Sequence, residues 1–221
     1  MLGMPISIVT VAILITSIGV KSFGALVLLM VGLAVLWMTS MMGSRVAVLA
    51  LAAIPIGYVG ARATNVWDGS QLVAAARIVG GEDRAGSVGV RVRNDGLLAA
   101  HAIQRPLFGW GGWDRHRPVA TTHRVITDSL WAIVMGQRGL VGLAALGGGL
   151  LLGYLRVFVC LPPRLVSDSR WAATASMGVV LGLFVVDCLF NAMWNPVFVM
   201  IAGAIGEAPA SWSVWCQMRR R

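Results

Sequence analysis

Charged side chains are scarce in this sequence. They make up 12% of its 221 residues, whereas hydrophobic residues make up 57%. A soluble domain has roughly one quarter charged residues, so this chain lacks the polar surface that a soluble globular protein needs. The same apolar composition argues against an intrinsically disordered chain. The sequence therefore predicts an all-α, polytopic integral membrane protein.

Acidic residues and lysine are also rare, and arginine supplies most of the charge. Nine acidic residues stand against 17 arginines and one lysine, which gives a formal net charge of +9. Because most of the chain is expected to lie in lipid, we expect membrane lipids, above all anionic ones, or a phosphate-bearing substrate as partners, and no nucleic acid.

Cysteine occurs only three times. Cys160, Cys188 and Cys216 lie in or beside apolar runs, and their spacing is not that of a metal site. We interpret all three as small apolar residues, and we expect neither a metal nor a cofactor.

Apolar runs predict about six transmembrane helices. Three belong to a first segment, residues 1–61, and two to three belong to a last segment, residues 139–221. Residues 62–138 hold ten arginines and six acidic residues, so we expect one large loop there, with a short helix at Asp95–Gln104 and a second short apolar piece at Ser129–Met135. The expected spans are Pro5–Val20, Phe23–Trp37, Val46–Val59, Leu140–Phe158, Trp171–Phe190 and a weaker run from Val197 to about Trp215.

The short basic loops predict the orientation. Arg156, Arg164 and Arg170 flank one short loop, and the terminal residues 219–221, all arginine, lie two spans later on the same side. Short basic loops face the cytoplasm, so we expect the C-terminus to be cytoplasmic, with Arg45 on the same side. Residues 62–138 are then extracytoplasmic. Loops beyond about 60 residues escape this rule, and a bound anion would account for part of their arginine content.

Three short motifs follow one another in the large loop. They are Arg91–Arg93 with the Pro-Leu-x-Gly-x-Gly pattern of Pro106–Gly111 that follows it, then Thr127–Trp131, and then Arg138–Leu143, which leads into a span. Their order, spacing and topology over residues 88–145 resemble the O-antigen ligase and O-antigen polymerase superfamily. Members of that family are polytopic glycosyltransferases of the bacterial plasma membrane. They take a glycan from a polyprenyl diphosphate carrier at the outer face.

The resemblance implies roles for single residues. Arg91 matches the family's loop arginine and Asp128 stands where the ligases carry a functional histidine, so these two are the catalytic candidates. The carboxylate favours a polymerase or a ligase-related enzyme. The chain matches only the C-terminal half of the family's members. Two alternatives stay open: the sequence is a fragment, or a partner supplies further helices. The substrate-binding candidates are Arg93, Arg138, His123, Gly109 and Gly111.

The residue types fit this chemistry. Attack by an acceptor hydroxyl on an anomeric carbon needs a proton acceptor, which a carboxylate such as Asp128 can provide. The diphosphate leaving group gains negative charge, and the planar guanidinium of an arginine binds such a group without deprotonating. The sequence thus predicts a metal-independent glycosyltransferase. A transporter- or flippase-like subunit and an inactive half-protein are the alternatives.

Simpler roles are open for the same residues. Arg91 and Asp95 have the spacing of an ion pair on a helix surface. Asp128 has the position of an N-cap for a helix that starts at Ser129. Arg138 could extend along the membrane edge, and Arg93 could be a solvated surface residue.

The remaining polar and aromatic residues have structural interpretations as well. We expect His101, His116 and His123 at the surface, and a cluster of arginines to disfavour protonation of His116. Trp110 and Trp113 are typical of an interfacial anchor, with sugar stacking as the alternative. Two further residues, Asp187 and Asn191, share a helix face and predict an interhelical hydrogen bond.

Overall fold

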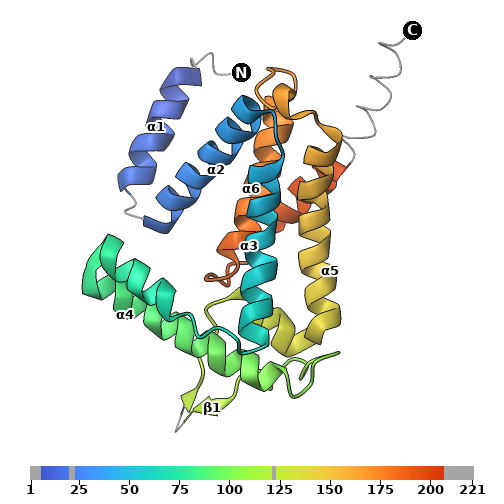
Figure 1. Ribbon diagram of the computed structural model, residues 1–221. Coiled ribbons are helices and arrows are strands. Elements are labelled where there is room, and N and C mark those ends of the chain that lie inside the picture. The colour runs from blue at the N-terminus through green and yellow to red at the C-terminus, as the bar shows by residue number, and fades with distance from the viewer. Residues whose placement is uncertain (1–5, 20–22, 121–122, 207–221) are drawn as a thin grey trace.

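The protein is almost entirely helical, as the sequence predicts. A computed structural model describes residues 6–19, 23–120 and 123–206. Its elements are α1 (Ile6–Gly19), α2 (Phe23–Met42), α3 (Val46–Ala63), α4 (Ser70–Ala102), β1 (Val119–Ala120), β2 (His123–Arg124), α5 (Leu130–Cys160), the 3-10 helix η1 (Pro163–Leu165), α6 (Ala172–Asp187) and a last helix, Pro196–Gly206 (Figure 1).

Three of the described helices are long and apolar enough to cross a membrane. They are α2 from Gly24 onward, α3 and α5, whereas α6 and Pro196–Gly206 are apolar but shorter. A helix of 14 residues, α1, covers most of the first expected span. Six spans therefore stay a prediction. Lys21, Glu207 and the terminal arginines lie outside the described residues.

The core of the bundle lies between α3, α5 and α6. Tyr154 of α5 is fully buried, donates a hydrogen bond to the carbonyl of Val48 (2.8 Å) and packs edge-on against Phe158. Glycines on α6 make room for these rings: a Cβ atom at Gly182 would lie 2.9 Å from the Tyr154 ring, and one at Gly178 would lie 3.0 Å from Phe158. Small residues at such positions let membrane helices approach closely.

Arg45 links α3 to α5 at one end of the bundle. From the start of α3 it donates to the carbonyls of Phe158 (2.6 Å) and Val159 (3.0 Å) in the last turn of α5. These carbonyls lack partners within the helix, and a cation there also complements the helix dipole. A Cβ atom at Gly43 would lie 3.5 Å from the Nε of Arg164, so both arginines lie at this end. That this end is cytoplasmic stays a prediction.

The long helix α4 is a helical hairpin. Gly81 (φ 74°, ψ −171°) interrupts it, and the two halves return antiparallel to one another across the opposite end of the bundle (Figure 1). Val73 of the first half faces Gly89 of the second, because a Cβ atom there would lie 3.9 Å from both Val73 methyl groups. The sequence predicted a helix only at Asp95–Gln104, which is too short. The many glycines and charged residues of α4 make its apolar face difficult to recognise in the sequence.

Helix α5 bends at Gly139 (φ 65°, ψ −163°). The part before the bend, Leu130–Arg138, lies across the end of α3, and the part after it continues into the bundle (Figure 1). At about 1.5 Å per residue, Leu140–Cys160 is about 30 Å long, which matches the hydrocarbon thickness of a bilayer.

The hairpin generates a first prediction. At its φ and ψ, Gly81 occupies a region that only glycine adopts readily, so Gly81→Ala should destabilise the protein by roughly 1–3 kcal/mol. Gly86→Ala is the matched control, because Gly86 is an exposed α4 residue with open space around its Cα. Alanine there should leave the protein unchanged or stabilise it by about 0.5–1 kcal/mol. Thermal unfolding in detergent measures both, and equal Tm values would contradict the hairpin geometry.

Candidate functional site

A buried carboxylate joins three helices at the end of the bundle where α4 lies. Asp95 of α4 is 2% exposed. It accepts hydrogen bonds from the Tyr58 hydroxyl of α3 (3.0 Å), the Trp131 indole N–H of α5 (3.2 Å) and the Ser129 hydroxyl that precedes α5. The predicted ion pair between Arg91 and Asp95 does not form, because the Asp95 side chain faces this junction.

The environment of Asp95 changes its acidity. Burial raises the pKa of this carboxyl, because an ionised group loses hydration there. The three hydrogen bonds and the nearby charge of Arg62 act in the opposite direction, and burial outweighs them. Asp95 therefore holds its proton to a higher pH than an exposed aspartate.

Arg62 clamps the hairpin to α3. It is 6% exposed and donates to the carbonyls of Trp67 (3.1 Å) and Val92, while its Nε has no hydrogen-bond partner in the part of the chain that the structure describes. Beside it, the Tyr58 ring packs edge-on against the rings of Trp67 and Phe190, with ring centroids 5.7 Å and 5.4 Å apart respectively. The aromatic cluster seals Asp95 and Arg62 from water.

The segments that carry the two catalytic candidates both contact one turn, residues 188–191, which follows α6. Half-buried Arg91 donates to the carbonyl of Phe190 (3.4 Å). The backbone N–H of Leu130, two residues after Asp128, donates to the carbonyls of Cys188 (3.0 Å) and Asn191 (3.1 Å). The structure thus brings these two segments, distant in sequence, to the same turn.

Asp128 is not a helix cap. Helix α5 begins at Leu130, so Ser129 occupies the N-cap position, and its hydroxyl bonds to Asp95 instead of to the helix. The capping hypothesis for Asp128 is therefore wrong. Its side chain is half-exposed, and it forms no hydrogen bond with the part of the chain that the structure describes.

The polar residues at the end of α6, Asp187 and Asn191, bond to one another and not to another helix. Asn191 donates to the Asp187 carboxylate (2.6 Å) within the turn that ends the helix. The predicted interhelical hydrogen bond is therefore wrong, because the helix stops at Asp187 and Asn191 no longer lies on its face. The pair shapes the turn that receives Arg91 and Leu130.

The Pro106–Gly111 pattern and the Arg138–Leu143 motif pair with one another in the structure. The segment Pro106–Gly111 lies along the bend of α5 and is joined to it by four backbone–backbone hydrogen bonds. This pairing holds the loop at the start of the long apolar part of α5. The four hydrogen bonds are Trp110 N–H to Gly136 O (2.8 Å), Gly111 N–H to Gln137 O (3.0 Å), Leu140 N–H to Pro106 O (2.7 Å) and Val141 N–H to Leu107 O (3.2 Å).

Glycines make this junction possible. Gly109 and Gly139 both have a positive φ, of 67° and 65°. A Cβ atom at Gly109 would lie 2.6 Å from the carbonyl oxygen of Gly136, and one at Gly139 would collide with the carbonyl of Leu107. These glycines are needed for backbone contact. Substrate binding by Gly109 and Gly111 stays a prediction.

The tryptophan pair separates into two environments. Trp110 stacks on His101 (4.3 Å between ring centroids), lies 4.4 Å from the Arg105 guanidinium and donates to the carbonyl of His101 (3.0 Å). Trp113 is 93% exposed. Only Trp113 has the exposure that an anchor needs.

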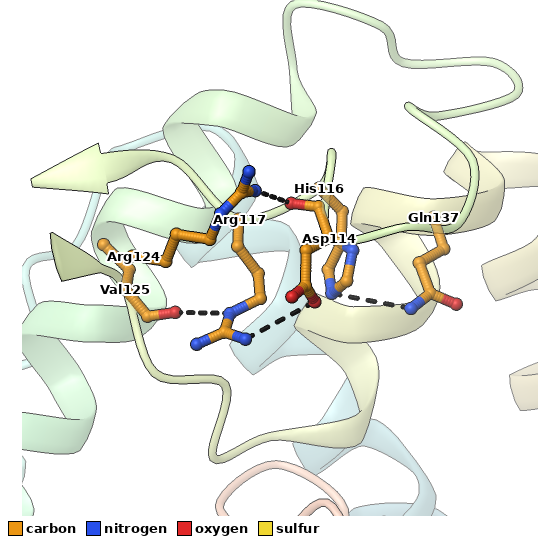
Figure 2. A network of polar contacts seen from close by, with 6 residues as sticks. All are labelled: Asp114, His116, Arg117, Arg124, Val125 and Gln137. Atoms are coloured by element: carbon orange, nitrogen blue, oxygen red, sulfur yellow. Dashed lines mark hydrogen bonds and ion pairs between the residues drawn. The ribbon is translucent and has the colours of Figure 1, made fainter.

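A hydrogen-bonded network orders the loop that follows (Figure 2). Arg117 donates to the carbonyl of Val125 (2.9 Å) and to the Asp114 carboxylate (3.4 Å), and Arg124 donates to the Asp114 carbonyl (2.6 Å). His116 points toward Gln137 of α5, with 3.5 Å between the two Nε2 atoms. The network ties the strand pair to the bend of α5.

His116 is buried, so its predicted surface position is wrong. It is 5% exposed, and its Nδ1 has no hydrogen-bond partner among the described residues. Burial lowers its pKa, and Arg117 and Arg124 act in the same direction, while Asp114 opposes them. The arginines lower the pKa of His116 as the sequence predicts, but burial lowers it more.

The other candidates do not gather at one point. Arg93, His123 and Arg138 are exposed, on α4, β2 and α5 respectively. Sequence reasoning missed Tyr58 and Arg62. It placed Ser129 and Trp131 in the motif that carries Asp128 but gave them no role, because the four residues come together only in the folded chain.

Comparisons with known proteins add no identity: no family model, no curated protein and no solved structure matches this chain. Within residues 6–19, 23–120 and 123–206, no group of three or more His, Cys, Asp or Glu side chains could hold a metal ion. The function is therefore argued from the residues themselves.

The interlocked glycines generate a second prediction. Gly109→Ala should lower the free energy of unfolding by roughly 1–3 kcal/mol, because alanine is strained at this positive φ and its Cβ would collide with the α5 backbone. The neighbouring Gly112→Ala is the control, since a Cβ atom there meets nothing within 4 Å. Thermal unfolding of the two variants in detergent gives the comparison. An equal loss of stability in both variants would argue against the close backbone contact between Gly109 and α5.

Asp95 generates a third prediction. Its folded-state pKa is raised, so the folded protein binds this proton more tightly than the unfolded chain. The resulting stabilisation is complete below the unfolded pKa and is lost as the pH rises through the folded pKa. Asp95→Asn removes this contribution. As the pH rises from about 4 to about 7, the Tm of Asp95→Asn should therefore increase relative to that of the wild type. Parallel plots of Tm against pH for the two proteins would contradict the raised pKa of Asp95.

Proposed function

We propose that this protein transfers a glycan from a polyprenyl diphosphate carrier to a sugar hydroxyl at the outer face of a bacterial plasma membrane, as an enzyme of the O-antigen ligase or polymerase type. The observation that carries the proposal is the meeting of the Arg91 and Asp128 segments at the turn 188–191. The backbone pairing of Pro106–Gly111 with the bend of α5 adds support, because it joins two motifs of that family.

Arg91 is the proposed diphosphate ligand. A guanidinium has five N–H donors, and within the described residues that of Arg91 makes one hydrogen bond, a long one of 3.4 Å to Phe190. The other donors are free to bind phosphate oxygens in the forked geometry that arginine favours. Close to the bilayer, where the dielectric constant is low, this charge would strongly stabilise the leaving group.

Asp128 is the proposed proton acceptor. The acceptor hydroxyl oxygen attacks the anomeric carbon and forms the new glycosidic bond, while the bond from that carbon to the diphosphate oxygen breaks. The hydroxyl proton passes to the Asp128 carboxylate, and polyprenyl diphosphate leaves with the bonding electrons. Among the described residues this carboxylate has no hydrogen-bond partner, which leaves its oxygens available for this step.

A transporter- or flippase-like subunit is the second candidate, because Asp95 and Arg62 are buried charges between helices. Their hydrogen bonds are made within the protein, at one end of the bundle, which favours a structural role for both. An inactive half-protein that packs against a partner would show neither activity.

A transfer assay with matched variants tests the proposal. Membranes with equal amounts of protein receive an undecaprenyl diphosphate-linked, radiolabelled glycan and a sugar acceptor. Asp128→Asn should lose about 10²–10⁴-fold in rate, because an amide cannot accept the proton. Arg91→Ala should also lose activity, and Arg91→Lys should restore only part of it, because an ammonium lacks the planar fork.

Asp83→Asn is the control for the carboxylate. Asp83 is an exposed acid on α4, so its amide variant should keep the wild-type rate. A transfer rate of Asp128→Asn within about twofold of wild type would mean that the activation barrier changes by less than roughly 0.5 kcal/mol. That result would refute the role of Asp128 as proton acceptor. A wild-type membrane that transports the carrier but never transfers the glycan would refute the enzyme and favour the flippase.

A further inference from the structure

The loop that follows α4 presents large apolar side chains outward. Leu107 is 59% exposed, Phe108 is 73% exposed and Trp113 is 93% exposed. Soluble proteins rarely expose contiguous apolar patches without using them for contact. These three residues, here called the loop patch, therefore need a covering partner.

The loop patch continues the lipid-facing surface of α5. The carbonyl of Leu107 accepts a hydrogen bond from Val141 N–H (3.2 Å), so the loop lies against the first turn after the bend. Leu140 and Val141 are themselves exposed, at 46% and 52%, and they begin the apolar stretch that can span a membrane. Figure 1 shows the loop after α4 beside the bent end of α5. The patch thus lies level with one end of a span.

Basic side chains border the loop patch. Arg105, Arg115 and Arg138 are all exposed. The acid in this loop, Asp114, pairs with Arg117 (3.4 Å), and within the described residues none of these three arginines forms an ion pair. Apolar side chains with a border of arginines match the boundary between acyl chains and lipid phosphates.

The backbone holds Trp113 outward in a strained conformation. Its φ is 60°, a left-handed region that bulky side chains rarely adopt. A water-exposed turn would be more stable with glycine or asparagine at this position. An indole at the lipid headgroups, by contrast, gains from its apolar ring and its polar N–H together.

We infer that residues 105–115 form an interfacial anchor whose partner is the phospholipid bilayer around α5. Leu107, Phe108 and Trp113 enter the boundary between headgroups and acyl chains, and the bordering arginines contact lipid phosphates. The inference does not depend on glycan transfer. Through the backbone pairing with α5, the anchor would hold the segment Pro106–Gly111 at headgroup depth.

Tryptophan quenching in nanodiscs tests the anchor with the full chain. The protein has nine tryptophans, so the emission of Trp113 is obtained as the difference between wild type and Trp113→Phe. The discs contain phosphatidylcholine and phosphatidylglycerol, with or without chains brominated near the headgroup. The Trp113 emission should be blue-shifted, should lose most of its intensity to brominated lipid and should resist aqueous acrylamide.

Trp110→Phe is the matched control, because Trp110 is held between His101 and Arg105. Its difference emission should be quenched much less by brominated lipid. Strong quenching of Trp113 by acrylamide without quenching by brominated lipid would show a water-exposed loop and overturn the inference. Resistance to both quenchers would show a protein partner or a second copy on the patch, and would overturn it as well.

Discussion

The carboxylate of Asp95 is the interaction on which the arrangement of this protein depends most. It accepts hydrogen bonds from Tyr58, Ser129 and Trp131, which belong to α3, to the approach to α5 and to α5 itself. A buried acid without such partners would be costly, and each donor left unpaired would cost roughly 1–3 kcal/mol. The three donors therefore have to reach the same point, which fixes the hairpin of α4 against the ends of two other helices. The positions of Arg91, one turn before Asp95, and of Asp128, next to Ser129, follow from this constraint.

A second constraint acts through backbone atoms. Pro106–Gly111 pairs with the bend of α5 at distances that leave no room for side chains at Gly109 and Gly139. Such contacts specify shape independently of side-chain chemistry, so they hold the loop firmly while the side chains that project from it are free for other tasks. Trp110 turns inward to His101, whereas Trp113 faces outward. The same rigid segment thus connects the candidate site to the surface of the span.

The two ends of the bundle differ in what their arginines do. At one end Arg45 binds the last carbonyls of α5 and serves the packing of helices. At the other end Arg62 is buried in the α4 junction, while Arg91 retains donors that no described residue uses. An arginine with such available donors beside a polar turn, at the end of the bundle where the long apolar part of α5 begins, is suited to a phosphate-bearing lipid. This difference between structural and available arginines supports the proposed function better than their number does.

Composition and apolar runs sufficed to predict an all-helical chain, the apolar runs Phe23–Trp37 and Val46–Val59, which the structure extends as helices to Met42 and Ala63, and the separate apolar piece Ser129–Met135 before the bend at Gly139. These features depend on local hydrophobicity and on glycine or proline breaks. They also singled out Pro106–Gly111 and Arg138–Leu143 as motifs. The hairpin at Gly81, the burial of His116 and the true partner of Asp95 could not be read from sequence. Tertiary contacts decide these features: spacing along one helix pairs Arg91 with Asp95, but the donors on α3 and α5 offer the carboxylate a drier and better-satisfied site. Only the folded chain shows which polar residues are used to hold the helices together and which are left to meet a ligand.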